Sequence, residues 1–234
     1  MNRREFHTRS ISIVALCAAF AYQQAHAISL ADLSSVDASK GIKEALEKGA
    51  LAAVGVLGVT DGFLGNEKVR IPLPGYLQDA ANLMRTFGQS ARVDELITAM
   101  NRGAEAAVPM AKDLLVGAVK TMSVTDAKGI LQGGDTAVTD FFAGKTRAPL
   151  AGKFLPIVTQ TTNKVGLAEK YNQVAGKAAD LGLVKKEDAN IQQYVTGKAL
   201  DGLYLMISEE EKKIRQNPVA YGSGMLSKVF GAIR

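Results

Sequence analysis

The side chains best suited to nucleophilic or metal chemistry all lie near the start of the chain. Cys17, His7 and His26 are the only cysteine and histidines among 234 residues. Zinc sites need thiolates or imidazoles, and nucleophilic pairs usually need histidine. Without this segment, both mechanisms and any disulfide framework are excluded. Carboxylates, lysine, tyrosine and hydroxyl groups would remain for acid–base work, and oxygen ligands for hard cations.

The first 27 residues have the layout of a secretory signal peptide. Three arginines precede a short apolar run, Ile11–Tyr22, and Ala25-His26-Ala27 places small residues at the positions a signal peptidase reads. The run is shorter than the roughly 20 residues that span a bilayer. We therefore expect cleavage after Ala27 and a periplasmic or otherwise exported protein of bacterial origin.

Two variants of this leader differ in the route they imply. Arg3-Arg4-Glu5-Phe6 resembles the core of a twin-arginine signal, although the flanking residues depart from it, so this route and the general secretory route both stay open. A lipid-attached Cys17 is disfavoured, because the bulky Leu16 precedes it and the apolar run continues beyond it.

The mature chain is expected to be weakly basic. Cleavage leaves 207 residues, and loss of three arginines and one glutamate lowers the formal net charge from +5 to +3. This charge is too small to indicate nucleic-acid binding. We expect no nucleic-acid partner, no metal, no disulfide and no cofactor, and no apolar stretch after the leader is long enough to span a membrane.

The apolar residues recur with a helical period through nearly the whole mature chain, which predicts a single all-α domain over residues 28–234 built as a multi-helix bundle. Helices are expected in the following ranges: 37–58, 75–88, 93–122 with a kink or break at Pro109, 125–133, 135–145, 147–163, 167–181 and 219–231. Gly182 is a predicted C-cap. Residues 69–74 contain two prolines and are the one extended segment, at most a short edge pairing.

The long C-terminal helix is the clearest element, ending at Asn217-Pro218. Its predicted buried stripe is Ile191, Tyr194, Val195, Ala199, Leu203, Met206, Ile207 and Ile214. The acidic run 209–211 with the following lysines is interpreted as a solvated helix face with pairs Glu209–Lys213 and Glu211–Arg215.

The stretch from Ser123 to Pro149 holds the most polar side chains that could form a site. Ser123 and Asp126 have the spacing of a capping box, and Asp135 follows Gly133-Gly134, where it can cap the next helix. These structural roles are preferred to an anion or cation site at the glycine turn. The candidate ligand or interaction residues are Arg70, Asp126, Asp135, Asp140, Arg147 and Glu210, and no catalytic residue is assigned.

Several motifs resemble one bacterial exported family. The segments "GFLGNEKVRIPLPGYL", "MSVTDAKGILQGGDTAVTDFF", "LVKKEDANIQQYVTGKALDGLYLMISEEEKKIRQNP" and "SKVFG" are similar, in order and spacing, to the family catalogued as domain of unknown function 4197. The resemblance covers about Leu30 to Gly231. It implies a signal-bearing, mostly helical protein, and it implies no activity, cofactor or catalytic residue.

Three functional hypotheses follow from these observations. The preferred one is a non-catalytic binding or interaction module of the bacterial envelope, with an unknown envelope protein or a small apolar ligand as partner; such a ligand would lie between helices. Glycines inside helical stretches suggest tight packing or a groove. A carboxylate-dependent hydrolase is the second hypothesis. The third is a peripheral membrane-surface protein that binds lipid through its tail, 219–231.

Overall fold

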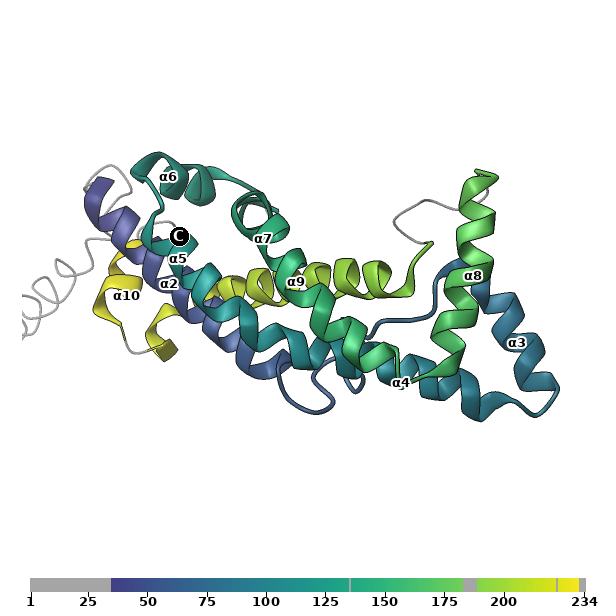
Figure 1. Cartoon of the computed structure of the whole chain (residues 1–234). Helices are drawn as coiled ribbons and strands as arrows, with labels where there is room; N and C mark the ends of the chain where they lie inside the picture. Colours follow the sequence, from purple (N-terminus) through teal and green to yellow (C-terminus); the bar gives the residue numbers. More distant parts are fainter. Residues whose placement is uncertain (1–34, 135, 183–188, 222, 232–234) are drawn as a thin grey trace, which may run out of the picture.

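The computed structural model describes residues 35–134, 136–182, 189–221 and 223–231, and these form an elongated bundle of helices (Figure 1). In the described residues there is no strand, so the predicted all-α fold class is confirmed. In chain order the elements are α2 (Ser35–Leu57), η1 (Gly75–Leu77), α3 (Gln78–Thr86), α4 (Ser90–Ala107), η2 (Val108–Ala111), α5 (Lys112–Lys120), α6 (Val124–Gln132), α7 (Ala137–Thr162), α8 (Gly166–Asp180), α9 (Ile191–Gln216), η3 (Pro218–Tyr221) and α10 (Gly224–Gly231).

Helix α9 is the central element of the bundle. It packs against α7 and α2, and α4 packs against both α7 and α9. All eight residues of its predicted apolar stripe are buried, as the helical period indicated. Among the helices that the structure describes, none combines the length and the apolar character needed to cross a bilayer.

Helix α7 corrects one prediction. The sequence predicted separate helices over 135–145 and 147–163, but α7 continues through Pro149 and Pro156. Every fourth residue from Val138 to Thr162 is buried, and this stripe packs on α4 and α9. Both prolines lie on the exposed side, where water can bind the carbonyl groups that lose their helical partner. The packing of the buried stripe therefore outweighs the local cost of the prolines.

The other predicted boundaries hold within a few residues. The expected interruption at Pro109 is confirmed, because the 3-10 segment η2 separates α4 from α5. Gly182 has a φ of +73° and donates its N–H to the carbonyl of Ala179 at 2.9 Å, which confirms the predicted C-cap of α8. The predicted helix 219–231 is divided, since η3 precedes α10 and lets it fold back on α2.

The tail helix α10 docks on α2 in this fold. Leu226 and Val229 are fully buried, and the ammonium of Lys228 lies 2.8 Å from a carboxylate oxygen of Asp37. Helix α2 has Gly41 at this contact, where a Cβ atom would lie 2.5 Å from a methyl group of Val229. Glycine is therefore required for this close approach, and the apolar face of the tail is turned toward protein.

The acidic run at the end of α9 is a second correction. Glu210 and Glu211 are buried, whereas the sequence interpretation placed them on a solvated face. Helix α2 crosses here through Gly49, whose ideal Cβ position lies 3.7 Å from the Cβ of Glu210. The pair Glu211–Arg215 forms as predicted at 2.7 Å, but the ammonium of Lys213 lies 2.6 Å from Glu210 instead of Glu209.

The partner of Glu209 comes from the loop before α3. Its carboxylate lies 2.7 Å from the ammonium of Lys68. The hydrogen bond from Lys68 lowers the pKa of Glu209, and the hydrogen bond to Glu210 raises the pKa of Lys213. The acidic run therefore divides its three carboxylates among three different cationic residues.

The capping box at the start of α6 is present as predicted. The hydroxyl oxygen of Ser123 accepts the N–H of Asp126 at 3.0 Å, and the carboxylate of Asp126 accepts the N–H of Ser123 at 3.0 Å. The backbone N–H of Ser123, followed by its hydroxyl, lowers the pKa of Asp126 below its ordinary value of 3.8.

We expect Ser123→Ala to lower the free energy of unfolding by about 1 kcal/mol, because the first turn of α6 loses its cap. The lowered pKa of Asp126 contributes stability above pH 3.8, which is lost as the pH falls through the folded-state value. The substitution should therefore cost less at a pH low enough to protonate Asp126 in the folded state than at neutral pH, because the carboxylate charge is then absent from both states. Urea unfolding at the two pH values measures this. An equal loss at both would contradict a role for the Asp126 charge.

Candidate functional site

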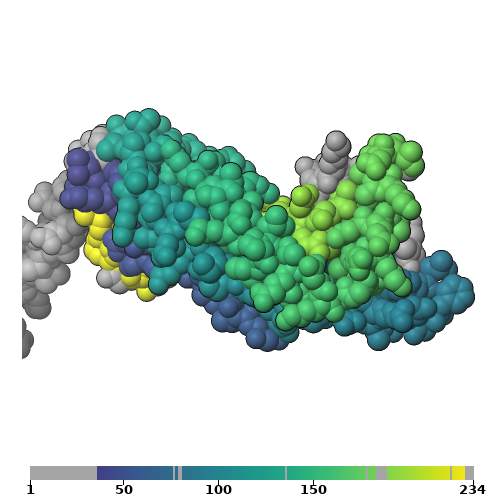
Figure 2. Space-filling view, in the orientation of Figure 1, coloured from purple at the N-terminus to yellow at the C-terminus, as the bar shows by residue number. Residues whose placement is uncertain are grey.

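One end of the molecule is formed by α3, the first turns of α4, and α8, which stand beyond the central bundle (Figures 1 and 2). We call this part the arm. Helices α3 and α4 are joined at Gly88, whose φ of +73° permits the tight turn between them. Helix α8 comes much later in the chain and packs on α4. The arm thus brings together two helices that are distant in sequence.

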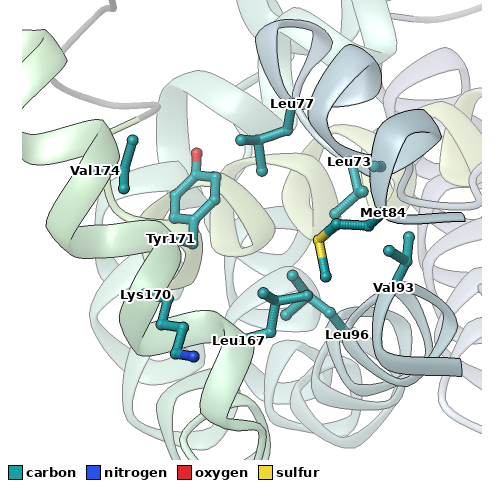
Figure 3. A pocket seen from close by; sticks show the side chains of 10 residues that line it. Leu73, Leu77, Met84, Val93, Leu96, Leu167, Lys170, Tyr171 and Val174 are labelled. Carbon is teal, nitrogen blue, oxygen red and sulfur yellow. The ribbon is translucent and has the colours of Figure 1, made fainter. Parts of the chain in front are cut away.

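The arm encloses an apolar pocket between its three helices. Its volume is about 190 Å³ and its lining is almost wholly carbon. The lining residues are Leu73, Leu77, Ala81, Met84, Val93, Leu96, Leu167, Lys170, Tyr171 and Val174. Figure 3 shows the side chains of Leu77, Met84 and Leu96 pointing toward a shared space that faces Leu167 and Tyr171. We refer to this cavity as the apolar pocket.

The arm carries several exposed apolar side chains, one of which lines the apolar pocket. Val174 lines the pocket and is 66% exposed, Leu83 on α3 is 59% exposed, and Phe87, just after α3, is 73% exposed. Leu181, just past the end of α8, is 75% exposed. Large apolar side chains that stay in contact with water near a cavity indicate an interaction surface more than a finished core.

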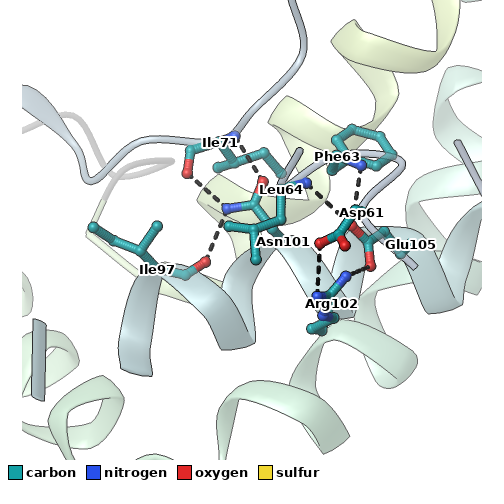
Figure 4. A network of polar contacts seen from close by, with 8 residues as sticks. All are labelled: Asp61, Phe63, Leu64, Ile71, Ile97, Asn101, Arg102 and Glu105. Carbon is teal, nitrogen blue, oxygen red and sulfur yellow. Dashed lines mark hydrogen bonds and ion pairs between the residues drawn. The ribbon is translucent and has the colours of Figure 1, made fainter. Parts of the chain in front are cut away.

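A segment before α3 supplies part of the wall of the apolar pocket, and the side chain of Asn101 on α4 fixes its position (Figure 4). Asn101 is fully buried. Its carbonyl oxygen accepts the N–H of Ile71 at 2.9 Å, and its amide donates to the carbonyl oxygen of Ile71 at 3.0 Å. The side chain of Asn101 thus bonds both backbone polar groups of Ile71, as a neighbouring strand would. Ile71 lies two residues before Leu73, which lines the pocket.

Glu105, one turn further along α4, holds the start of the same loop. One carboxylate oxygen accepts the N–H groups of Phe63 at 3.0 Å and Leu64 at 3.1 Å. The other lies 2.6 Å from the guanidinium of Arg102, which also contacts Asp61 at 2.8 Å. These two carboxylates raise the pKa of Arg102, with the bond to Glu105 contributing most.

We call the set Asp61, Asn101, Arg102 and Glu105 the polar clamp. Asp61 has a φ of +66°, a conformation that non-glycine residues rarely adopt, although aspartate tolerates it better than most. In this conformation its carboxylate lies 2.8 Å from the guanidinium of Arg102. The polar clamp positions the loop, and it offers no open coordination site or free nucleophile.

Side-chain amides fasten α8 to the start of α9. Asn172 accepts the N–H of Ile191 at 2.9 Å and donates to the side chain of Gln192 at 2.9 Å. Gln192 in turn donates to Asn163 at 3.0 Å. This chain of amides fixes the base of α8, and so fixes the face of α8 that closes the apolar pocket.

The structure does not bring the sequence-predicted site residues together. Asp126 belongs to the capping box, Arg147 pairs with Asp201 at 2.8 Å, and Glu210 pairs with Lys213. Arg70 and Asp140 are exposed. Asp135 lies outside the described residues. None of the five described residues lines the apolar pocket.

The glycine turn that the sequence singled out does border a recess. Gly133 and Gly134 line about 400 Å³ of polar space together with the end of α9, which contributes Glu211, Lys212, Arg215 and Gln216. The guanidinium of Arg215 donates twice to Glu211, at 3.0 and 2.7 Å. A ligand role for this turn stays a prediction.

Of the acidic side chains available to a hydrolase, Asp126, Asp201, Glu209 and Glu210 are engaged in a helix cap or in ion pairs, whereas Asp140 is exposed. Asp201 and Glu209 lie in ion pairs on separate parts of the surface, and the pKa values of Asp126 and Glu209 are lowered, opposite to what a general acid requires. Within the described ranges, no three acidic side chains gather closely enough to hold a metal ion.

Sequence reasoning missed the residues that define this site. In the sequence, nothing distinguishes Met84, Leu96 and Tyr171 from other residues on the apolar face of a helix. Likewise, nothing distinguishes Asn101 and Glu105 from other polar residues within a helix. The available signal was the pair of buried polar positions 101 and 105 inside the apolar stripe of α4, since a polar residue on a buried face needs a partner.

The chain belongs to the family described as "Protein of unknown function (DUF4197)", which it matches over residues 32–231. This confirms the resemblance drawn from the sequence motifs. Neither a curated protein nor a solved structure shows significant similarity to the chain.

Proposed function

We propose that this protein is a non-catalytic binding module whose apolar pocket accepts a small apolar ligand or the apolar part of a larger one. The observation that carries the proposal is the carbon-lined cavity of about 190 Å³ between α3, α4 and α8. Apolar cavities of about this size hold ligands such as benzene in other proteins. Val174, which lines the pocket and is 66% exposed, supports access from outside.

The chemistry of the apolar pocket favours binding over catalysis. Only Lys170 and Tyr171 among its lining residues carry a titratable group, and no aspartate or glutamate is among the residues that line it. Acid–base catalysis needs two positioned proton-transfer groups or one with a prepared partner. Burial of an apolar group is therefore the interaction that this lining can provide.

The proposal includes export of the protein to the bacterial envelope. Its support is the leader over residues 1–27, with its arginines, short apolar run and small residues before the expected cleavage point. N-terminal sequencing of protein isolated from its native host tests this. A first residue at Ile28 agrees with the proposal, and an intact Met1 would contradict it.

The binding proposal is tested by titrating the purified chain with 1-octanol, a neutral single-chain compound, in a calorimeter. We expect saturable binding with a negative heat-capacity change, the signature of buried apolar surface. Ala81→Leu fills the pocket from α3, where Ala81 is 4% exposed, and should abolish the heat of binding.

The matched control is Ala106→Leu, which adds the same side chain at an exposed position of α4. It should bind octanol as the unmodified protein does. Absence of octanol binding to the unmodified chain, or unchanged binding to Ala81→Leu, would refute the proposal.

A further inference from the structure

A second recess continues from the apolar pocket along α8. It is lined by Arg92, Glu95, Gly166, Leu167 and Lys170, has a volume of about 270 Å³, and shares Leu167 and Lys170 with the apolar pocket. We call it the charged recess. Because two lining residues are common to both cavities, the cavities adjoin each other.

The size of the apolar pocket indicates a ligand that extends beyond it. Pockets that enclose drug-sized ligands measure about 300–1,000 Å³, and the apolar pocket is smaller, at about 190 Å³. It can hold an apolar end group or a short chain, while the remainder of a larger ligand would enter the charged recess. The occupant therefore has an apolar part and a polar part.

The charged recess carries two cationic side chains and one carboxylate. Arg92 makes one long hydrogen bond, 3.4 Å to the side-chain oxygen of Gln89, and Lys170 is exposed. Neither is in an ion pair with a residue that the structure describes, whereas Arg85, Arg102, Arg147 and Arg215 are each paired with a carboxylate. The charged recess is net positive, because only Glu95 opposes the two cations.

Lys170 connects the two environments. It lines both the apolar pocket and the charged recess, and Figure 3 shows its side chain beside Leu167. Lysine commonly covers apolar surface with its stem while its charged end remains in a polar environment. The same arrangement suits a ligand in which an apolar chain leads directly to an acid group.

We propose that the occupant is a monomeric single-chain amphiphile with an anionic head group. Its chain lies in the apolar pocket among Met84, Leu96 and Tyr171, and its acid group lies in the charged recess near Lys170 and Arg92. This inference rests on the proposed function, and adds the chemical class of the ligand and the residues that recognise its charge.

The experiment compares octanoate with 1-octanol, which have the same chain length and differ in charge. At neutral pH and low salt, the unmodified chain should bind octanoate about fivefold more tightly than octanol, the preference expected for partly exposed charges. High salt should remove this preference without weakening octanol binding, because it screens the head group alone.

Two substitutions locate the charge recognition. Lys170→Met keeps a long apolar stem, so it should remove most of the octanoate preference while octanol binding is retained. Glu95→Gln removes the opposing carboxylate and should tighten octanoate binding about twofold, with no effect on octanol.

The outcomes separate this inference from the proposed function. Equal affinity for octanoate and octanol, unchanged by Lys170→Met, overturns the anionic head group and leaves the apolar pocket as the binding site. Binding of neither compound overturns both proposals. Binding to vesicles of anionic phospholipid without binding of monomeric octanoate also overturns the inference, because the arm would then recognise a membrane surface.

Discussion

Replacement of Asn101 by leucine is expected to lower the free energy of unfolding by about 2–5 kcal/mol, one of the two largest effects that the fold predicts. The substitution preserves volume but leaves the N–H and C=O of Ile71 without partners inside the protein. A buried polar group that loses its partner costs about 1–3 kcal/mol, and two such groups are affected here.

Equilibrium unfolding in urea measures the loss as a lower midpoint with an unchanged slope. The matched control is Asn82→Leu on α3, where the asparagine is exposed; we expect a change within about 0.5 kcal/mol. If Asn101→Leu were as stable as the control, the backbone of residues 69–74 would not depend on Asn101.

The prediction for Asn101→Leu also extends to function, because Leu73 would lose its fixed place in the wall of the apolar pocket.

The second large effect is expected for Glu105→Ala, which should destabilise the protein by about 2–4 kcal/mol. Glu105 is 5% exposed, and its loss leaves the N–H groups of Phe63 and Leu64 unpaired and removes one of the two carboxylates paired with Arg102. Glu105→Gln should retain part of this stability, since its carbonyl oxygen can still accept both N–H groups, while Arg102 keeps only its ion pair with Asp61.

Glu67→Ala provides the control, because Glu67 belongs to the same loop and is exposed. Its unfolding midpoint should match that of the unmodified protein. The ordering Glu67→Ala, Glu105→Gln, Glu105→Ala, from most to least stable, is the result that the polar clamp predicts. Equal midpoints for Glu105→Gln and Glu105→Ala would show that the two N–H bonds contribute little and that the charge is decisive.

Local patterns in the sequence were sufficient for most helices and for their caps. The capping box of α6 joins Ser123 to a residue three positions away, and Gly182 ends α8 through bonds within its own last turn. The buried stripe of α9 follows from a helical period that any partner helix would select. In each case the interacting atoms lie within one or two turns of chain, so their spacing in the sequence fixes their geometry.

The predictions that were wrong concern contacts between residues that are far apart in the sequence. The continuity of α7 through Pro149 depends on its contacts with α4 and α9, and the burial of Glu210 depends on the crossing of α2 at Gly49. Propensity and charge patterns describe a helix alone, and a neighbour supplied by another part of the chain overrides them.

By itself, the sequence determined the helical fold class, the position of most elements, the leader-like start and the exclusion of histidine and cysteine chemistry beyond it. Only the tertiary structure decided where a ligand could bind. The apolar pocket needs α3 and α8 side by side on α4, and the polar clamp joins residues 30 to 42 positions apart. Periodicity reveals which side chains avoid water, but a cavity is the space that those side chains leave unfilled, and that depends on how all the helices pack together.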